Sequence, residues 1–532
     1  RGGYRFGATP LNDFATDPSI VSGWVNDSIT PILIRLTKVY NGPEDETATG
    51  PNFPHSYTIQ VDIANNQTVT NLDVIDELAF NQQYLGYANA IPGPTTLIDQ
   101  PLTPGAQNPP NNDLDVRFSS VTGGLGSNDA SLDVQFFIPQ YDANGGYVLP
   151  PATGDDAISC NNARAIGDWT PIDPRDVGGT DNAVADPAGC EHQLEDQSIA
   201  IQKGVANISD PNNTPGDVHQ CTLQFQISDY FAFQNIVITD VFSDGQRFDA
   251  TFIPTLTLSE HGANTSGSFD LSNFTVFLDS PGTGETTVTF RVSNELVSRS
   301  LDGQVLGGCV PAGGTGGPDP ACAVYNSGAT TGTIRFRTII QENFSDTYLP
   351  GDPSVDQGDI LWNDVIIAGD VLAVSNLTPT GFNEEDDSHA QIEIARGDLQ
   401  KSIYGINGVT PAPSPVRVAP ADTVTFRLRY FMPNSDFENF YIIDYLPLPV
   451  FSATEVSGPF NNTICGLPAA GTACLGPDDT YHLLPSAIVP TITTDGTANS
   501  VRFDYGDYDV VGGPSSVVDI LFTVTVEGDP FA

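Results

Sequence analysis

Residues 215–225 read PGDVHQCTLQF, and from Gln220 onward polar residues alternate with apolar ones. This period of two is typical of a β-strand that buries one face. The same pattern recurs as PHSYTIQV at residues 54–61 and as PADTVTFRLRY at residues 420–430. Three such strands, spread along the chain, predict a repeated β-structure with Tyr57, Cys221 and Phe426 in register on the inward face.

Three further strands follow each of these segments in the same order. The second strand reads NLDVIDEL at residues 71–78, NIVITDVF at 235–242 and NFYIIDYL at 439–446. We place the third strand at residues 114–118, 274–277 and 500–503, and the fourth at 132–137, 333–337 and 518–522. Residues 287–293 are interpreted as an extra strand of the second copy.

A closing strand completes the first two copies, as ISCNNARA at residues 158–165 and ILWNDVII at 360–367. The third copy has no counterpart, but PLNDF at residues 10–14 matches it. We therefore expect an all-β chain of three tandem immunoglobulin-like β-sandwiches in a rod. The expected parts are an N-terminal strand and linker at 1–28, unit 1 at 29–196, unit 2 at 197–388 and unit 3 at 389–532. Residues 171–197 and 376–388 are expected to be linkers or edge loops.

These landmarks resemble the conserved repeat domain found in tandem in bacterial and archaeal cell-surface proteins. That pattern has a lysine in the first strand, Pro-Gly-Asp before an alternating strand, an aspartate in the next strand and an asparagine in the closing strand. The matches in unit 2 are Lys203, residues 215–217, Asp240 and Asn363, whereas unit 1 is more divergent. The resemblance implies an extracellular, cell-surface location and a role as stalk, adhesin or surface-layer material.

The chain contains only three lysines, Lys38, Lys203 and Lys401, and each lies at the end of the first strand of a unit. A solvated surface does not require lysine over arginine, so one site per unit needs a primary amine. Burial lowers the pKa of an amine and raises that of a carboxylic acid, so both groups can be neutral in contact. A neutral amine can attack an asparagine carboxamide while an aspartic acid relays protons and ammonia leaves, which forms an isopeptide bond.

Units 1 and 2 each offer the complete set. Unit 1 has Lys38, Asp76 and Asn161, and unit 2 has Lys203, Asp240 and Asn363. Asn162 and Asp364 lie one residue further on and could be confused with the true partners. We expect the first and last strands to run side by side, with the aspartate strand on the facing sheet, an arrangement that resembles the self-crosslinking domains of Gram-positive pilins and adhesins. The alternative is a buried Lys–Asp ion pair with a hydrogen-bonding asparagine, although arginine usually serves an ion pair better.

Unit 3 has Lys401 and Asp444 but no asparagine partner, whereas Asn12 has no lysine partner. We hypothesise that the segment around Asn12 of one molecule completes unit 3 of the next by strand addition. Such a head-to-tail contact generates a filament, and a bond from Asn12 to Lys401 would make the filament covalent. The alternative is a slice of a longer repeat protein, such as an adhesin stalk or a surface-layer protein that binds carbohydrate or a host surface.

The charge and composition restrict the classes of molecule that we expect the chain to bind. The chain has 66 acidic residues against 19 basic ones, a formal net charge of −47, which disfavours nucleic acid and anionic lipid. Its apolar runs are too short to span a bilayer. Because it lacks a His-Glu-x-x-His pair, a phosphate-binding loop and a nucleophile elbow, we expect no enzyme for a diffusible substrate. The expected partners are copies of the chain itself, with carbohydrate or other surface proteins as further candidates, and an enzyme accessory module is a third option.

Seven cysteines at short spacings indicate an oxidising compartment. We expect disulfides between Cys309 and Cys322, between Cys465 and Cys474, and between Cys160 and Cys190, which leaves Cys221 as a buried core thiol. No cofactor is expected other than calcium, for which several acidic turns offer oxygen ligands. These candidates are Asp142, Asn144, Asp352, Asp356, Asp359, Asp504, Asp507 and Asp509. None belongs to a complete calcium loop, so solvated acidic turns are the alternative.

Overall fold

The computed structural model describes residues 2–4, 25–27, 32–101, 113–126, 128–171, 178–184, 190, 192–209, 211–259, 267–311, 313–314, 322, 326, 328–345, 353–434, 437–456, 490–508 and 516–528. Nearly every described element is a strand, and the exceptions are helix α1 (Val292–Ser298) and the short 3₁₀ turn η2 (Ala453–Glu455). The predicted all-β class is confirmed. Among these residues, no helix is long and apolar enough to cross a membrane.

Two sheets make up unit 1. One has the strand order β3-β5-β10-β7, and the other has the order β4-β13-β11-β6-β9-β8, with β12 paired to β11. A large hydrophobic cluster that includes Tyr57, Ile59 and Val61 fills the space between them. The strands are β3 (Ile34–Tyr40), β4 (Glu46–Ala48), β5 (His55–Ile63), β6 (Thr68–Glu77), β7 (Gln83–Ile91), β8 (Thr95–Asp99), β9 (Asp113–Thr122), β10 (Ala130–Phe137), β11 (Ala157–Trp169), β12 (Gly179–Val184) and β13 (His192–Gln197). Strands β1 (Gly2–Tyr4) and β2 (Val25–Asp27) pair separately.

Unit 2 repeats this plan. Its sheets have the orders β14-β15-β23-β18-β19 and β20-β21-β16-β24-β25, with β17 paired to β23 and β22 to β16. A second hydrophobic cluster, which includes Phe225, Phe290 and Phe336, lies between them. The strands are β14 (Ile199–Asn207), β15 (Val218–Ile227), β16 (Ala232–Phe242), β17 (Gln246–Phe248), β18 (Thr255–Ser259), β19 (Gly267–Asp270), β20 (Thr275–Asp279), β21 (Thr286–Arg291), β22 (Val305–Leu306), β23 (Thr330–Ile340), β24 (Ile360–Ala373) and β25 (Thr378–Glu393).

Unit 3 has two sheets of three strands, with the orders β26-β27-β31 and β28-β30-β29. They enclose a third cluster, which includes Phe426, Phe503 and Phe522. The strands are β26 (Asp398–Ile406), β27 (Thr423–Met432), β28 (Phe437–Tyr445), β29 (Thr491–Asp495), β30 (Ser500–Tyr508) and β31 (Ser516–Thr525). Within the described part of the chain, β28 therefore stands at the edge of its sheet.

The stretches expected to be linkers contain strands. Residues 171–197 include β12 and β13, which both pair with β11, and residues 376–388 belong largely to β25, which pairs with β24. The acidic run at 384–387 does not prevent this, because Asp386 is buried and accepts a hydrogen bond of 2.6 Å from the backbone N–H of Ile201. The expected boundary between residues 388 and 389 falls inside β25.

The third strand of unit 2 differs from the one expected. In unit 1, β9 pairs with β6, and in unit 2 the corresponding neighbour of β16 is β21, not the strand at residues 274–277. Residues 275–277 of that stretch lie in β20, which among the described strands pairs only with the outer side of β21, as β8 does with β9. Residues 287–293 are therefore the regular third strand, continued into α1, because sequence order alone does not reveal which strands pair.

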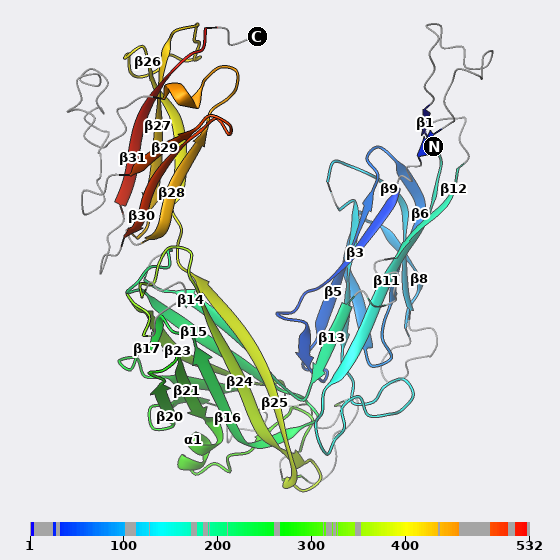
Figure 1. The fold of residues 1–532 in the computed structure, drawn as a ribbon. Helices are drawn as coiled ribbons and strands as arrows, with labels where there is room; N and C mark the ends of the chain where they lie inside the picture. The colour runs from blue at the N-terminus through cyan, green and yellow to red at the C-terminus, as the bar shows by residue number, and fades with distance from the viewer. Residues whose placement is uncertain are drawn as a thin grey trace.

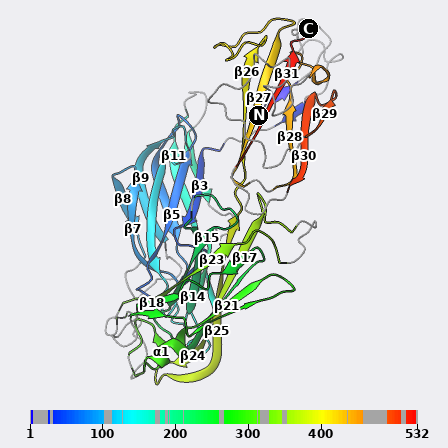
Figure 2. The same cartoon turned by 90° about the vertical axis from the view of Figure 1, so that its left-hand side faces the viewer.

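Figures 1 and 2 show three groups of strands along a path that bends at unit 2, so the expected rod is bent there. Lateral contacts hold units 1 and 2 together at the bend. The carboxylate of Asp229 accepts hydrogen bonds of 2.8 and 2.9 Å from the backbone and the side chain of Asn52. Small residues Ala48 and Ala200 pack with Phe53 at the same junction.

Candidate functional site

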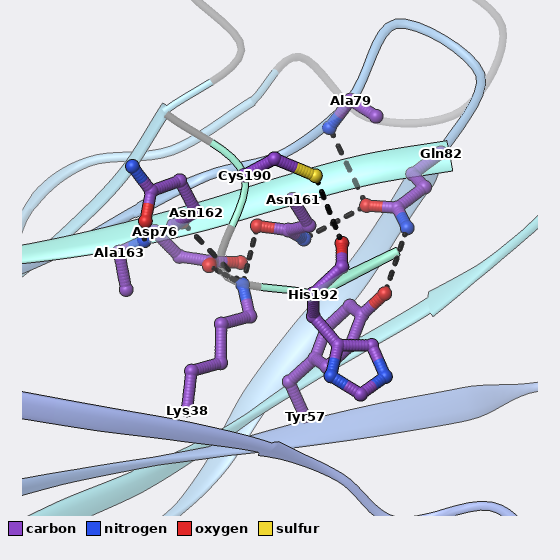
Figure 3. Close-up of polar contacts among 10 residues, drawn as sticks. All are labelled: Lys38, Tyr57, Asp76, Ala79, Gln82, Asn161, Asn162, Ala163, Cys190 and His192. Carbon is purple, nitrogen blue, oxygen red and sulfur yellow. Dashed lines mark hydrogen bonds and ion pairs between the residues drawn. The ribbon is translucent and has the colours of Figure 1, made fainter. Parts of the chain in front are cut away.

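The alternation of β3 points Lys38 into the interior of unit 1. Buried and exposed residues alternate strictly along this strand, and Lys38 falls on the buried side. Its side chain is fully buried, as is that of Asp76 on β6. The Nζ atom of Lys38 donates hydrogen bonds to Asp76 Oδ1 and to Asn161 Oδ1, where Asn161 lies on β11. The structure thus brings the three predicted residues of unit 1 together (Figure 3).

A chain of hydrogen bonds through Gln82 to Tyr57 fixes the orientation of the Asn161 carboxamide (Figure 3). Asn161 Nδ2 donates a hydrogen bond of 2.8 Å to Gln82 Oε1, and Gln82 Nε2 donates one of 3.1 Å to the Tyr57 hydroxyl. The Lys38 Nζ atom lies 4.2 Å from the centre of the Tyr57 ring. The carbonyl side of the amide therefore faces the lysine, and its nitrogen faces away.

Unit 2 repeats the set with different surroundings. Lys203 Nζ contacts Asp240 Oδ2 and donates a hydrogen bond of 2.5 Å to Asn363 Oδ1, and the side chains of Lys203 and Asp240 are fully buried. The Asn363 Nδ2 atom is buried without a hydrogen-bond partner among the described residues. Cys221 occupies the register of Tyr57 and is fully buried in the core of unit 2, and this burial raises the pKa of its thiol to about 12.

The two sets share one register. On paired strands, Asp76 lies opposite Ala163, two residues after Asn161, and Asp240 lies opposite Val365, two residues after Asn363. Residues two apart in a strand point to the same face, so each asparagine and aspartate point together toward the lysine.

This register corrects the expected strand arrangement. The aspartate and asparagine strands are neighbours in one sheet, and the lysine strand lies on the facing sheet. Each lysine also lies within its strand, with β3 ending at Tyr40 and β14 at Asn207, instead of at the strand end. The cluster therefore bridges the two layers of each sandwich.

The pKa values of the three aspartates are shifted in the same direction and for the same reason. Burial raises the pKa of Asp76 and of Asp240, and the adjacent lysine offsets the rise in part. Burial likewise raises the pKa of Asp444, again against the effect of Lys401. The second carboxyl oxygen of each acid is buried and has no hydrogen-bond partner among the described residues. A raised pKa favours the protonated acid, which can donate a proton during an exchange of amide partners.

Unit 3 also has a lysine–aspartate pair, Lys401 and Asp444, but its lysine is partly exposed to solvent. Lys401 Nζ lies 2.5 Å from Asp444 Oδ1 and 4.6 Å from the centre of the Phe426 ring. The Lys401 side chain is 37% exposed, whereas those of Lys38 and Lys203 are 0% exposed. Among the residues that the structure describes, no asparagine contacts Lys401. The proposed partner Asn12 lies outside the described residues.

Two predicted disulfides are confirmed. Cys160 bonds to Cys190 and Cys309 bonds to Cys322, each with a Cα–Cα distance of 5.4 Å, and Cys221 is free and buried. The third predicted pair, Cys465 and Cys474, lies outside the described residues.

The candidate calcium ligands are not gathered into a site in the described part of the chain. Asp142 accepts backbone hydrogen bonds within its own turn, Asp359 accepts one from the backbone of Asp356, Asp504 pairs with Arg502, and Asp507 accepts one from Asn439. The single metal-compatible group found there joins Asp229 to Cys309 and Cys322, which are disulfide-bonded. Asn144 donates its backbone N–H to Asp142. Asp352 and Asp509 lie outside the described residues.

The sequence interpretation missed two kinds of residue. Gln82 reaches Asn161 from the loop before β7, and no pattern marks it. Asn71, Asn235 and Asn439 were also missed, although each stands five residues before the aspartate of its unit. All three have a positive φ, between 48° and 54°. The shared spacing was a usable signal.

Comparisons with known proteins give structural neighbours only. The sequence matches no protein-family description and no curated protein. The major pilin BcpA of Bacillus cereus matches with 7% identity and a TM-score of 0.22, over 75% of this chain and 80% of that chain. The major pilin SpaD of Corynebacterium diphtheriae matches with 8% identity and a TM-score of 0.21, over 76% and 75%. The collagen adhesin of Staphylococcus aureus matches with 9% identity and a TM-score of 0.18, over 67% and 92%. The neighbours are thus surface pilins and an adhesin, at values that do not establish a shared family.

Proposed function

We propose that this chain is an extracellular structural subunit of a pilus- or fibre-like surface filament, with units closed by Lys–Asn isopeptide bonds. One observation carries the proposal: a buried lysine, a buried aspartate and an asparagine recur in units 1 and 2 with the same strand register. An ion pair alone requires neither the asparagine at a fixed place nor lysine in preference to arginine.

The reaction uses only these groups. The lysine Nζ attacks Cγ of the asparagine, a new N–C bond forms, and the bond from Cγ to Nδ2 breaks. The aspartic acid donates its proton to the leaving nitrogen and receives a proton from the attacking amine, so it is regenerated. One ammonia leaves for each bond, and neither an oxidant nor a cofactor is required.

Intact mass and peptide mapping test this step. Each bond lowers the mass by about 17 Da, beyond the loss due to disulfides. Digestion should yield two branched peptides, one joining Lys38 to Asn161 and one joining Lys203 to Asn363. An unshifted mass in freshly purified, fully folded protein would leave only the buried ion pair. Branching at Asn162 would move the reacting position by one residue and contradict the register that points Asn161 and Asp76 to the same face.

Assembly is the second part of the proposal. The supporting features are the exposed Lys401, the buried Asp444 and the edge position of β28 among the described strands. A strand from another molecule, with the segment around Asn12 as the candidate, would pair with β28 and bring an asparagine to Lys401. Boiling the assembled material in SDS should leave a ladder at multiples of the subunit mass. A single band from material that is filamentous before boiling would contradict the covalent contact, and absence of any filament would favour the adhesin-stalk alternative.

A further inference from the structure

The closing strand β24 of unit 2 is held at a second point, seven residues beyond Asn363. There Asp370 Oδ2 accepts a hydrogen bond of 2.7 Å from Asn235 Nδ2. Asn235 has a φ of 54° and sits at an irregularity in the pairing of β16 with β24. Gly369, the residue before Asp370, packs closely on Phe233, because a Cβ atom on Gly369 would lie 3.1 Å from the Phe233 ring. A larger residue would press on Phe233 of the neighbouring strand β16.

Unit 1 has the same second point. Asp168, seven residues beyond Asn161, accepts a hydrogen bond of 3.1 Å from Asn71 Nδ2, and the φ of Asn71 is 49°. A Cβ atom on Gly167 would collide with Val69. The pattern Asn-x5-Gly-Asp occurs at these two places and nowhere else in the 532 residues. Both closing strands therefore carry an asparagine for the lysine and a Gly-Asp pair for a second asparagine.

Unit 3 contains an asparagine, Asn439, that corresponds to Asn71 and Asn235 of this second contact. Asn439 stands five residues before Asp444, as its counterparts do in units 1 and 2, and its φ is 48°. Its backbone N–H donates a hydrogen bond of 2.8 Å to Asp507, while its side chain is exposed and bonds to no described residue. The closing strands of units 1 and 2 run antiparallel to the aspartate strand. The same register on β28 would bring an asparagine to Lys401 and an aspartate to Asn439.

We propose that unit 3 selects its completing strand at two points, an asparagine at Lys401 and a Gly-Asp pair at Asn439. The ligand is an extended segment of another polypeptide with the pattern Asn-x5-Gly-Asp, antiparallel to β28. The inference rests on the proposed function, in which another molecule completes unit 3. The segment around Asn12 meets the first requirement only, since Pro18 and Ser19 occupy the positions of the glycine and the aspartate. It should therefore be the slower ligand.

Synthetic peptides added to the full chain test the selection. The first peptide copies residues 360–373, the second is the same with Asp370→Ala, and the third copies residues 9–22. The first should form an adduct whose mass is the sum of protein and peptide less about 17 Da. The second should react about tenfold more slowly, because a hydrogen bond to a charged group is lost. The third should also be slower than the first.

Two protein variants give the controls. Lys401→Arg should abolish the adduct while still binding the first peptide, as measured by fluorescence anisotropy. Asn439→Gly keeps a residue that tolerates positive φ and removes the amide, so the first two peptides should then react at the same rate.

The outcomes separate this inference from the proposed function. Equal rates for the first two peptides on the unmodified chain, or the fastest reaction from the third peptide, would overturn the two-point selection and leave strand complementation standing. Tighter binding of the first peptide without an adduct would support the selection and contradict the isopeptide bond in unit 3. If no peptide binds or reacts, both the selection and the completion of unit 3 by another molecule are refuted.

Discussion

Units 2 and 3 present the same lysine and aspartate in two different environments. In unit 2, β24 lies beside the aspartate strand, supplies Asn363 and leaves Lys203 fully buried. In unit 3, β28 has no such neighbour among the described strands, and Lys401 is 37% exposed. One strand thus supplies both the electrophile and the cover that excludes water. Burial and reaction at these lysines should therefore be gained or lost together.

The largest effect should come from making unit 2 resemble unit 3. Asn363→Ala keeps the Lys203–Asp240 pair and removes the carboxamide. The mass should show one ammonia loss fewer, and the unfolding free energy of unit 2 should fall by about 5 kcal/mol, because a crosslink between residues 160 apart in sequence restricts the unfolded chain. Mass spectrometry and denaturant unfolding measure these changes.

Asp364→Ala is the matched control for this variant. Asp364 is exposed on the same strand, one residue from Asn363, and should retain both the bond and the stability. If the two chains differed in mass only by the Asn-to-Ala substitution, with no further change of about 17 Da, Asn363 would not be a reacting residue.

A smaller effect concerns the acids where unit 2 meets unit 1. Burial raises the pKa of Glu46 to about 9, with help from Asp386 and Glu44, and burial raises the pKa of Asp386 to about 7. A carboxyl group whose pKa is raised by folding contributes its full stabilisation of the folded state below its unfolded pKa, near 4. This stabilisation is lost as the pH rises through the folded pKa values of about 7 and 9. Thermal unfolding of units 1 and 2 should therefore shift to lower temperature between pH 6 and pH 10.

Glu46→Gln sharpens this test, because the amide stays neutral across the range. The variant should lose less stability than the unmodified chain between pH 6 and pH 10. Between units 2 and 3, by contrast, the neutral side chain of Gln357 donates a hydrogen bond of 2.6 Å to the Asn434 carbonyl. A pH shift of equal size in unit 3 would argue that the whole-chain charge, and not this junction, is responsible.

The smallest effect compares Asn235→Gly with Asn439→Gly. Both changes retain a residue that tolerates positive φ, but only Asn235 donates its side-chain hydrogen bond to an aspartate of a closing strand. The unfolding free energy should fall by about 1 kcal/mol more for unit 2 than for unit 3. Equal losses in the two units would mean that the hydrogen bond to Asp370 adds no net stability.

The sequence was sufficient for the fold class and for the residues of the clusters, because strand alternation and the three lysines are local signals. It was not sufficient for strand neighbours. The closing strand was expected beside the lysine strand, but it pairs with the aspartate strand, and such pairing depends on contacts between residues far apart in sequence. The acidic run of β25 misled the prediction for a related reason, since Asp386 is buried by β14 of the same unit and accepts the N–H of Ile201. Gln82 could not be found because only the folded loop brings it to Asn161.

The contact between β14 and β25 also sets the route by which tension would cross unit 2. The chain enters the unit at β14 and leaves it along β25, and the two are joined directly, for example by the Lys203 backbone N–H that donates to Ser388 Oγ at 3.0 Å. A bond from Lys203 to Asn363 would tie β14 to β24, whose backbone ladder with β25 runs nearly the whole length of both strands. A pull on the two ends would then act on this ladder at the end where Asn363 pairs with Ala390, and residues 204–362 would lie outside the stressed path, unable to add length. In single-molecule stretching, unit 2 should therefore release none of that span, whereas Asn363→Ala should release it.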